Sequence, residues 1–136
     1  MKQPAIIVDI DGTLAHMSGR SPYEYTKVST DTVDFVIKDM VNRYKDTHQV
    51  VIVSGRMHEC YKDTTMWLIQ NNIHCDRVFM RQQDDKREDS IIKREIYEKL
   101  IEPHYDVLFV LDDRNRVVKM WREIGLKCLQ VADGNF

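Results

Sequence analysis

Acidic residues occur in two closely spaced pairs whose oxygens could share one cation. Asp9 and Asp11 stand two residues apart in the run Asp-Ile-Asp-Gly-Thr, and Asp112 and Asp113 are adjacent further along the chain. Carboxylates held close together raise each other's pKa unless a cation neutralises them. A hard divalent cation such as Mg²⁺, which prefers oxygen ligands, resolves that conflict. We therefore interpret the two pairs as a candidate magnesium site.

Either acidic pair taken alone is also typical of a solvated turn or a helix N-cap. Their placement after two different apolar runs favours the metal site, because ligands bind beyond the carboxyl ends of the strands in open α/β sheets. Ser54 and Gly55 follow another apolar run, where a hydroxyl and backbone N–H groups suit a phosphate oxygen. Lys93 falls in a segment with helical spacing, where a solvated surface lysine is the usual outcome.

The elements that must position these residues are short apolar runs with helical segments between them. Five runs rich in β-branched residues predict buried parallel strands at residues 5–8, 50–53, 77–80, 107–111 and 127–131. Helical spacing occurs at residues 30–44, 64–72, 89–100 and 116–124. Ser29 or Thr30 can cap the first helix, and Gly125 suits the left-handed residue that ends the last. This alternation predicts an α/β fold with a parallel sheet covered on both faces.

The whole sequence, residues 1–136, has the composition of one globular domain. Hydrophobic residues make up 43% and charged residues 31%, and the formal net charge of −2 disfavours binding to long nucleic acid through overall charge. No apolar run has the length of a membrane helix. Cys60, Cys75 and Cys128 form no zinc-type pair and suit reduced thiols, so we expect a soluble, cytoplasmic protein. The irregular stretch 14–28 is long enough for a flap or a short hairpin.

Taken together, these motifs resemble those of the haloacid dehalogenase (HAD) superfamily of phosphohydrolases. The matching motifs, in chain order, are Asp9-Ile-Asp11-Gly12-Thr13, Ser54, Lys93 and Asp112-Asp113. Residues 9–23, 53–56, 112–114 and 118–125 further resemble the 3'-phosphatase domain of phage-type polynucleotide kinase/phosphatase, and the likeness extends to residue 136. The resemblance implies a three-layer α/β/α Rossmann-like core. Its five-stranded parallel sheet has the order 5-4-1-2-3, with a short flap after the first strand and no cap domain.

The resemblance also implies a role for each motif residue. Asp9 is the nucleophile that forms an aspartyl-phosphate, and Asp11 is the general acid and base. Mg²⁺ binds the Asp9 carboxylate, the backbone carbonyl of Asp11 and one or both of Asp112 and Asp113. Lys93 stabilises the transition state. The residues expected to bind phosphate or substrate are Thr13, Arg20, Ser54, Gly55, Arg56 and Asp89. Asp89 is also expected to steer Lys93 as its i,i+4 partner.

The expected substrate follows from the same resemblance. Without a large cap insertion the site is open and admits the 3'-phosphorylated end of a polynucleotide, DNA or RNA, in nucleic-acid end repair. The phosphate loop G-x-x-x-x-G-K-[ST] is absent, so we expect no kinase activity. Residues 57–72 form a shorter segment than the resembled domain has. We expect no membrane contact and no obligate protein partner.

Three other functions stay open on the sequence. A capless phosphatase of free nucleotides or other small phosphomonoesters would share every core residue. A phospho-acceptor signalling domain also clusters aspartates, Mg²⁺ and a lysine, but its acceptor follows the third strand, where this chain has Met80 and Arg81. A binding module without catalysis is disfavoured because every motif residue is present.

Overall fold

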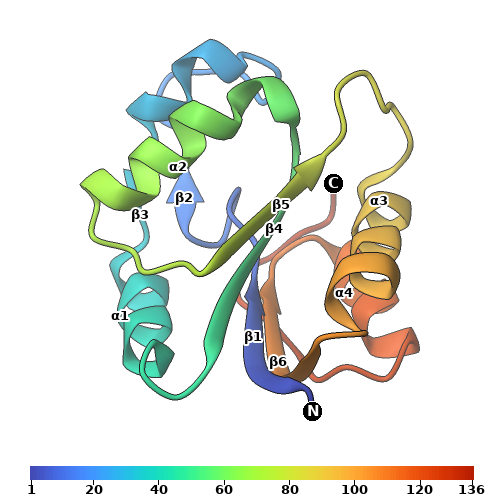
Figure 1. The fold of residues 1–136 in the computed structure, drawn as a ribbon. Helices are drawn as coiled ribbons and strands as arrows, with labels where there is room; N and C mark the ends of the chain where they lie inside the picture. Colours follow the sequence, from blue (N-terminus) through green and yellow to red (C-terminus); the bar gives the residue numbers. More distant parts are fainter.

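The computed structural model describes residues 1–136, and Figure 1 shows a central sheet between two layers of helices. The parallel strands are β1 (Gln3–Val8), β4 (Gln49–Met57), β5 (Arg77–Arg81), β6 (Tyr105–Asp112) and β7 (Cys128–Gln130). The helices are α1 (Phe35–Tyr44), α2 (Tyr61–Gln70), α3 (Asp89–Ile96) and α4 (Asn115–Glu123). The predicted α/β fold with a five-stranded parallel sheet is therefore confirmed.

The sheet has the strand order β5-β4-β1-β6-β7. Counted over the five parallel strands alone, this is the expected order 5-4-1-2-3 read from the opposite edge. The labels differ because β2 (Ala15–His16) and β3 (Thr32–Val33) form a separate antiparallel pair outside the main sheet. In this order β1 lies at the centre, hydrogen-bonded to β4 on one side and to β6 on the other.

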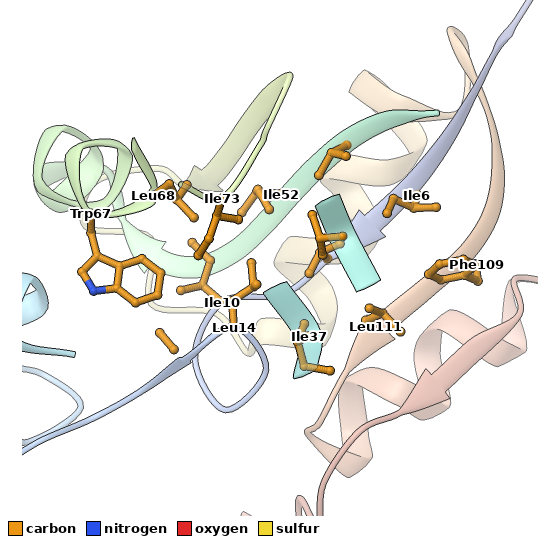
Figure 2. Packing of buried hydrophobic residues seen from close by; sticks show 14 residues of the cluster. Ile6, Ile10, Leu14, Ile37, Ile52, Trp67, Leu68, Ile73, Phe109 and Leu111 are labelled. Carbon is orange, nitrogen blue, oxygen red and sulfur yellow. The ribbon is translucent and has the colours of Figure 1, made fainter. Parts of the chain in front are cut away.

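Two hydrophobic clusters cover the two faces of the sheet. On one face α1 and α2 pack over the strands, and Figure 2 shows Leu68 of α2 near Ile52 of β4, with Trp67 farther out in the same cluster. On the other face α3 and α4 pack around Ile7 and Trp121. Successive side chains of a strand point to opposite faces, so strands buried on both faces are apolar at nearly every position. This double burial is the physical basis of the apolar runs in the sequence.

Helix α1 begins later than its apolar spacing predicts. The expected start at residue 30, with Ser29 or Thr30 as N-cap, is wrong because Tyr25–Thr30 form a separate 3₁₀ helix, η1, and β3 follows it. Asp34 is the N-cap, and its Oδ1 accepts hydrogen bonds from the N–H groups of Val36 and Ile37 at 3.1 and 3.2 Å. A side-chain acceptor here satisfies helix donors that have no partner within the helix.

The two later helices end in ways that the sequence partly predicts. Helix α3 continues into a π-helical segment, η3 (Tyr97–Ile101), so the predicted helical stretch 89–100 is a regular α-helix only over residues 89–96. Gly125 follows α4 with a φ of +93°, as its expected left-handed role requires.

The segment between β1 and α1 is a flap fastened to the rest of the molecule. Its two short strands, β2 and β3, pair with each other, and η1 packs against α2 and against η2 (His58–Cys60). The Trp67 indole N–H donates to the backbone oxygen of Asp31 at 2.9 Å and so ties the flap to α2. This agrees with the expected flap or hairpin, although the pairing extends it to Val33. None of the helices has the length and apolar content needed to cross a membrane.

Candidate active site

The carboxyl ends of β1 and β6, which are neighbours in the sheet, bring the two acidic motifs together. Asp9 follows β1, Asp112 ends β6, and Asp113 comes directly after it. One oxygen from each of these three side chains lies within 4.8 Å of the other two. All three residues are buried. Asp11 is not part of this cluster, and the expectation that its side chain stays off the metal remains a prediction.

Lys93 of α3 contacts two of the three carboxylates. Its Nζ donates to Asp9 Oδ1 at 2.8 Å and to Asp112 Oδ2 at 2.9 Å, and its side chain is only 3% exposed. The alternative of a solvated surface lysine is therefore wrong, because α3 turns this residue inward over the sheet. Burial lowers the pKa of Lys93, but the charges of Asp112 and Asp9 outweigh it and hold the pKa above its ordinary value. The site thus keeps one permanent positive charge.

One lysine does not balance three buried carboxylates. Burial and the charge of Asp112 raise the pKa of Asp9 well above its ordinary value, although Lys93 acts in the opposite direction. Burial and Asp112 also raise the pKa of Asp113. Three carboxylate oxygens facing a common point, with negative charge left over, are the donor set that a hard divalent cation prefers. The residues present therefore fit Mg²⁺.

Gly12 lets the loop after β1 pass directly against Asp113. Its φ is +82°, and a Cβ at this position would come within 2.0 Å of Asp113 Oδ2. The left-handed conformation and the lack of space both favour glycine here. Thr13 follows, and its hydroxyl donates to Asp9 Oδ2 at 3.0 Å. With Lys93 on Oδ1, both oxygens of Asp9 are held in place.

The carboxyl end of β4 contributes Ser54 and Gly55 to the site. Ser54 is fully buried, and its Oγ accepts a hydrogen bond from the backbone N–H of Arg56 at 3.1 Å. The register between β4 and β5 shifts between Ser54 and Met57, so the strand is irregular at this point. A Cβ on Gly55 would come within 2.7 Å of Asp89 Oδ1, so only glycine lets Asp89 approach. The proposed contacts of Ser54 and Gly55 with phosphate stay predictions.

Asp11 is held by two arginines. Arg56 donates to both of its oxygens, from Nε at 3.0 Å and from Nη2 at 2.7 Å, and Arg20 adds a longer bond of 3.3 Å. Both arginine side chains are only 1% exposed, whereas the Asp11 side chain is 38% exposed. Arg20 and Arg56 were expected to grip phosphate, but here their guanidinium groups bind carboxylates. Their contact with substrate stays a prediction.

Asp31 is the site residue that the sequence did not reveal. Its carboxylate accepts from Arg20 Nε at 2.7 Å, from Arg20 Nη2 at 2.9 Å and from Arg56 Nη2 at 2.7 Å, and its side chain is fully buried. Arg56 also donates to the hydroxyl of Thr64 in α2 at 2.9 Å. Asp31 belongs to no motif, and it falls in the stretch 30–44 whose spacing predicted only a helix, so no pattern in the sequence signals it as a site residue.

Asp89 binds two arginines instead of Lys93. Its Oδ1 accepts from Arg81 Nη2, and its Oδ2 accepts from Arg114 Nη1 at 2.7 Å. Asp89 forms no hydrogen bond or ion pair with Lys93, its expected i,i+4 partner, because the Lys93 Nζ bonds to Asp9 and Asp112. That the charge of Asp89 steers Lys93 stays a prediction. Burial raises the pKa of Asp89, but the charges of Lys93, Arg114 and Arg81 outweigh it and lower that pKa below its ordinary value.

Trp121 of α4 is a further residue whose contact with the site was not predicted. Its indole N–H donates to Asp112 Oδ2 at 3.2 Å, and it has no exposed surface. The other oxygen of Asp112 accepts from the backbone N–H of Asp113 at 2.8 Å. Asp112 is therefore oriented by Lys93, Trp121 and its own chain neighbour. The helical spacing of residues 116–124 predicted a helix, but it did not predict that Trp121 would also donate a hydrogen bond to a carboxylate of the site.

Known proteins resemble this chain over nearly its whole length. The family model for the polynucleotide kinase PNKP phosphatase domain matches residues 3–136. A putative bifunctional polynucleotide kinase/RNA ligase of Autographa californica nuclear polyhedrosis virus is 32% identical over 126 residues, which are 90% of this chain and 18% of that protein. The chain therefore spans a small part of this curated relative.

Solved structures also resemble the chain. Two chains from structures of the Pnkp1/Rnl/Hen1 complex, one described as an RNA repair complex, are 37% identical with a TM-score of 0.96 over 99% of this chain. The match covers 44% and 48% of those chains. A D,D-heptose 1.7-bisphosphate phosphatase from B. bronchiseptica, solved with magnesium and phosphate, has a TM-score of 0.62 at 14% identity over 94% of this chain and 80% of that one, which shows the fold alone. Since a family model covers residues 3–136, as the motifs predicted, the chain belongs to the polynucleotide kinase PNKP phosphatase domain family of HAD-type phosphatases.

Proposed function

We propose that this chain is a Mg²⁺-dependent phosphatase that removes the 3'-phosphate from the end of a polynucleotide through an aspartyl-phosphate. The observation that carries the proposal is that the site carboxylates lie in two separate environments. Asp9 lies with Asp112 and Asp113 around one point beside Lys93, whereas Asp11 is held apart by Arg56 and Arg20. A nucleophile and a separate proton donor are the two groups that this reaction needs.

In this proposal Asp9 is the group that attacks phosphorus. Lys93 and Thr13 bind its two oxygens, so its orientation is set before substrate arrives. A bond forms between an Asp9 oxygen and phosphorus while the bond from phosphorus to the 3'-oxygen breaks. Water then attacks phosphorus, releases inorganic phosphate and regenerates the Asp9 carboxylate. Lys93 stabilises the charge that develops on the phosphoryl oxygens, because its permanent ammonium lies against the attacking group.

Asp11 is suited to the proton transfers. It is the most exposed of the four aspartates, and its side chain is free of the acidic cluster. In the first half of the reaction it donates a proton to the leaving 3'-oxygen, and in the second half it accepts one from the attacking water. Arg56 holds it through two hydrogen bonds to opposite oxygens, a geometry that fixes the plane of the carboxylate.

Asp9, Asp112 and Asp113 are the side chains that would hold Mg²⁺. A bound Mg²⁺ supplies positive charge that offsets both these carboxylates and the phosphate. Lys93 alone leaves the cluster negative, so without a cation a phosphate dianion would be repelled from Asp9.

The polynucleotide substrate is supported by the lack of a folded cap over the site and by the relatives. The flap packs against α2 and η2, and no folded cap closes over Asp9. The relatives are named as a polynucleotide kinase/RNA ligase and as parts of an RNA repair complex. On that basis we propose that this chain also functions in RNA repair. We further propose that it acts there with a ligase or another repair protein as its partner.

An end-group assay tests the proposal. A 3'-phosphorylated oligonucleotide incubated with the protein and Mg²⁺ is expected to lose its terminal phosphate, and a free 3'-mononucleotide is expected to react far more slowly. Asp9→Asn is expected to abolish turnover while the circular dichroism spectrum is unchanged. Equal rates on the two substrates would instead support a phosphatase of small phosphomonoesters. Normal turnover by the Asn variant would remove the covalent mechanism.

A further inference from the structure

His58 and Tyr61 form a stacked aromatic pair directly beyond the end of β4. Their ring centroids are 5.1 Å apart, and the ring planes differ by 11°. His58 begins η2 immediately after β4, and Tyr61 is the first residue of α2, whose start follows the carboxyl end of β4 in Figure 1. Both residues are exposed, Tyr61 to 37%. Two parallel rings at the surface offer a flat apolar face to a planar ligand.

The pair is connected to Asp11 by a short chain of contacts. Tyr61 stands three residues before Thr64 on one face of α2, about one turn or ~5 Å along the axis. The Thr64 hydroxyl accepts from Arg56 Nη1 at 2.9 Å, and the same guanidinium holds both oxygens of Asp11. The start of α2 therefore lies on the Asp11 side of the site.

The reaction places the leaving nucleoside on that same side. In an in-line displacement the leaving oxygen is opposite the attacking Asp9 oxygen, and the proton donor must lie within hydrogen-bond reach of it. Because Asp11 is the proposed donor, the 3'-oxygen and its nucleoside must extend past Asp11. On this geometry the nucleoside is directed toward the start of α2, where His58 and Tyr61 are exposed.

We propose that the His58–Tyr61 pair is the stacking platform for the base of the terminal nucleotide, whose 3'-phosphate is removed. The inference rests on the proposed function. It adds the site at which the nucleoside of the leaving group is bound. Stacking on an aromatic side chain tolerates every base, because each base has a π-face, and it contributes about tenfold or more to binding. The platform thus binds any 3'-end without reading its sequence.

A substrate that lacks the terminal base can distinguish a stacking role of His58 and Tyr61 from a purely structural role. Two oligonucleotides are compared, both with a 3'-phosphate, one with a normal terminal nucleotide and one with a stable tetrahydrofuran residue in its place. For the wild-type protein the loss of the base should raise KM about tenfold with little change in kcat. Tyr61→Ala and His58→Ala should raise KM by a similar factor for the normal end only, and Tyr61→Phe should keep the wild-type KM.

A matched control is available at the opposite end of the sheet. His104 and Tyr105 are also an aromatic pair, with centroids 6.4 Å apart, but they lie at the start of β6, away from Asp9. His104→Ala should therefore leave KM unchanged on both oligonucleotides. His58 is exposed and makes no side-chain hydrogen bond, so His58→Ala keeps the test valid if Tyr61→Ala does not fold.

The outcomes distinguish the two proposals. If the wild-type protein is active and the alanine variants lower its activity equally on both oligonucleotides, or on neither, the stacking platform is overturned and the 3'-phosphatase stands. If the wild-type protein releases no phosphate from either oligonucleotide, both are overturned. A loss confined to the substrate that carries the terminal base supports the platform.

Discussion

Lys93 donates a hydrogen bond to Asp9 at 2.8 Å although the two residues are 84 positions apart in the chain. The bond is buried, and a second bond from the same ammonium reaches Asp112. A single side chain of α3 therefore joins the ends of two strands, β1 and β6, at the centre of the site. This contact is structural and electrostatic at once, which makes it the first point to test.

Replacing Lys93 by methionine should affect both activity and stability. The variant removes the only cation in contact with Asp9 and Asp112, and loss of one partner of a buried ion pair costs about 3–5 kcal/mol of unfolding free energy. The rate on a 3'-phosphorylated oligonucleotide should fall about 10²- to 10³-fold, the usual effect of losing one preorganised electrostatic contact. Urea denaturation and initial rates provide the two measurements. Lys119→Met, at a lysine whose side chain is 78% exposed, should change neither.

Removing the divalent cation should stop the reaction and destabilise the protein. Mg²⁺ that binds only the folded state raises its stability by about 2.7 kcal/mol at a hundredfold excess over the dissociation constant. We expect thermal unfolding to move upward with added Mg²⁺ in wild type, and much less in Asp113→Asn, which lacks one of the three clustered carboxylates. EDTA should abolish activity, and Mg²⁺ should restore it. Full activity in the presence of EDTA would contradict this prediction. So would an equal upward shift of thermal unfolding by Mg²⁺ in wild type and in Asp113→Asn.

Asp31→Ala should loosen both arginines of the site. It removes the fully buried carboxylate that Arg20 and Arg56 share and leaves them only the more exposed Asp11 as a carboxylate partner, which should cost about 3–5 kcal/mol of unfolding free energy. Because the same groups hold Asp11, kcat should fall as well. The matched control is Asp39→Ala, which removes an exposed ion pair with Arg43. If both variants are equally stable and active, Asp31 has no positioning role.

The contribution of Asp89 to stability should depend on pH. Its folded-state pKa lies below the ordinary 3.8, since the attraction of Lys93, Arg114 and Arg81 exceeds the effect of burial. Such a group stabilises the fold above its unfolded pKa, and this stabilisation is lost as the pH falls through the folded pKa. The difference in unfolding free energy between wild type and Asp89→Asn should therefore be constant near neutral pH and shrink below about pH 4. A difference that stays constant down to pH 3 in urea titrations would contradict the assigned charge state.

The strands and the motif residues could be predicted because their signals are local. Burial on both faces makes a strand apolar throughout, as in the run 107–111 within β6, and Asp112 and Asp113 follow it directly. The start of α1 could not be predicted from spacing alone. Asp34 caps it because β3 pairs with β2 just before, and that pairing joins residues far apart in the segment.

The network around Asp11 is the part of the site that spacing could not predict. This network joins two separate segments of the chain, one with Arg20 and Asp31 and one with Arg56. From the sequence, phosphate or substrate is the predicted partner of the two arginines, and Asp31 is not identified. Asp89 shows the same limit, since its helical spacing to Lys93 predicts a contact, whereas Lys93 bonds to Asp112 and Asp89 bonds to Arg114.

By itself the sequence determined the α/β fold, the strand ends that carry the acidic residues, and the family, because these depend on the local order of residue types. Only the tertiary structure decided which charges neutralise which. That choice depends on burial, because a charge that is removed from water requires a partner of opposite charge, and the chain order of Lys93, Asp31 and Arg56 contains no record of where water is excluded.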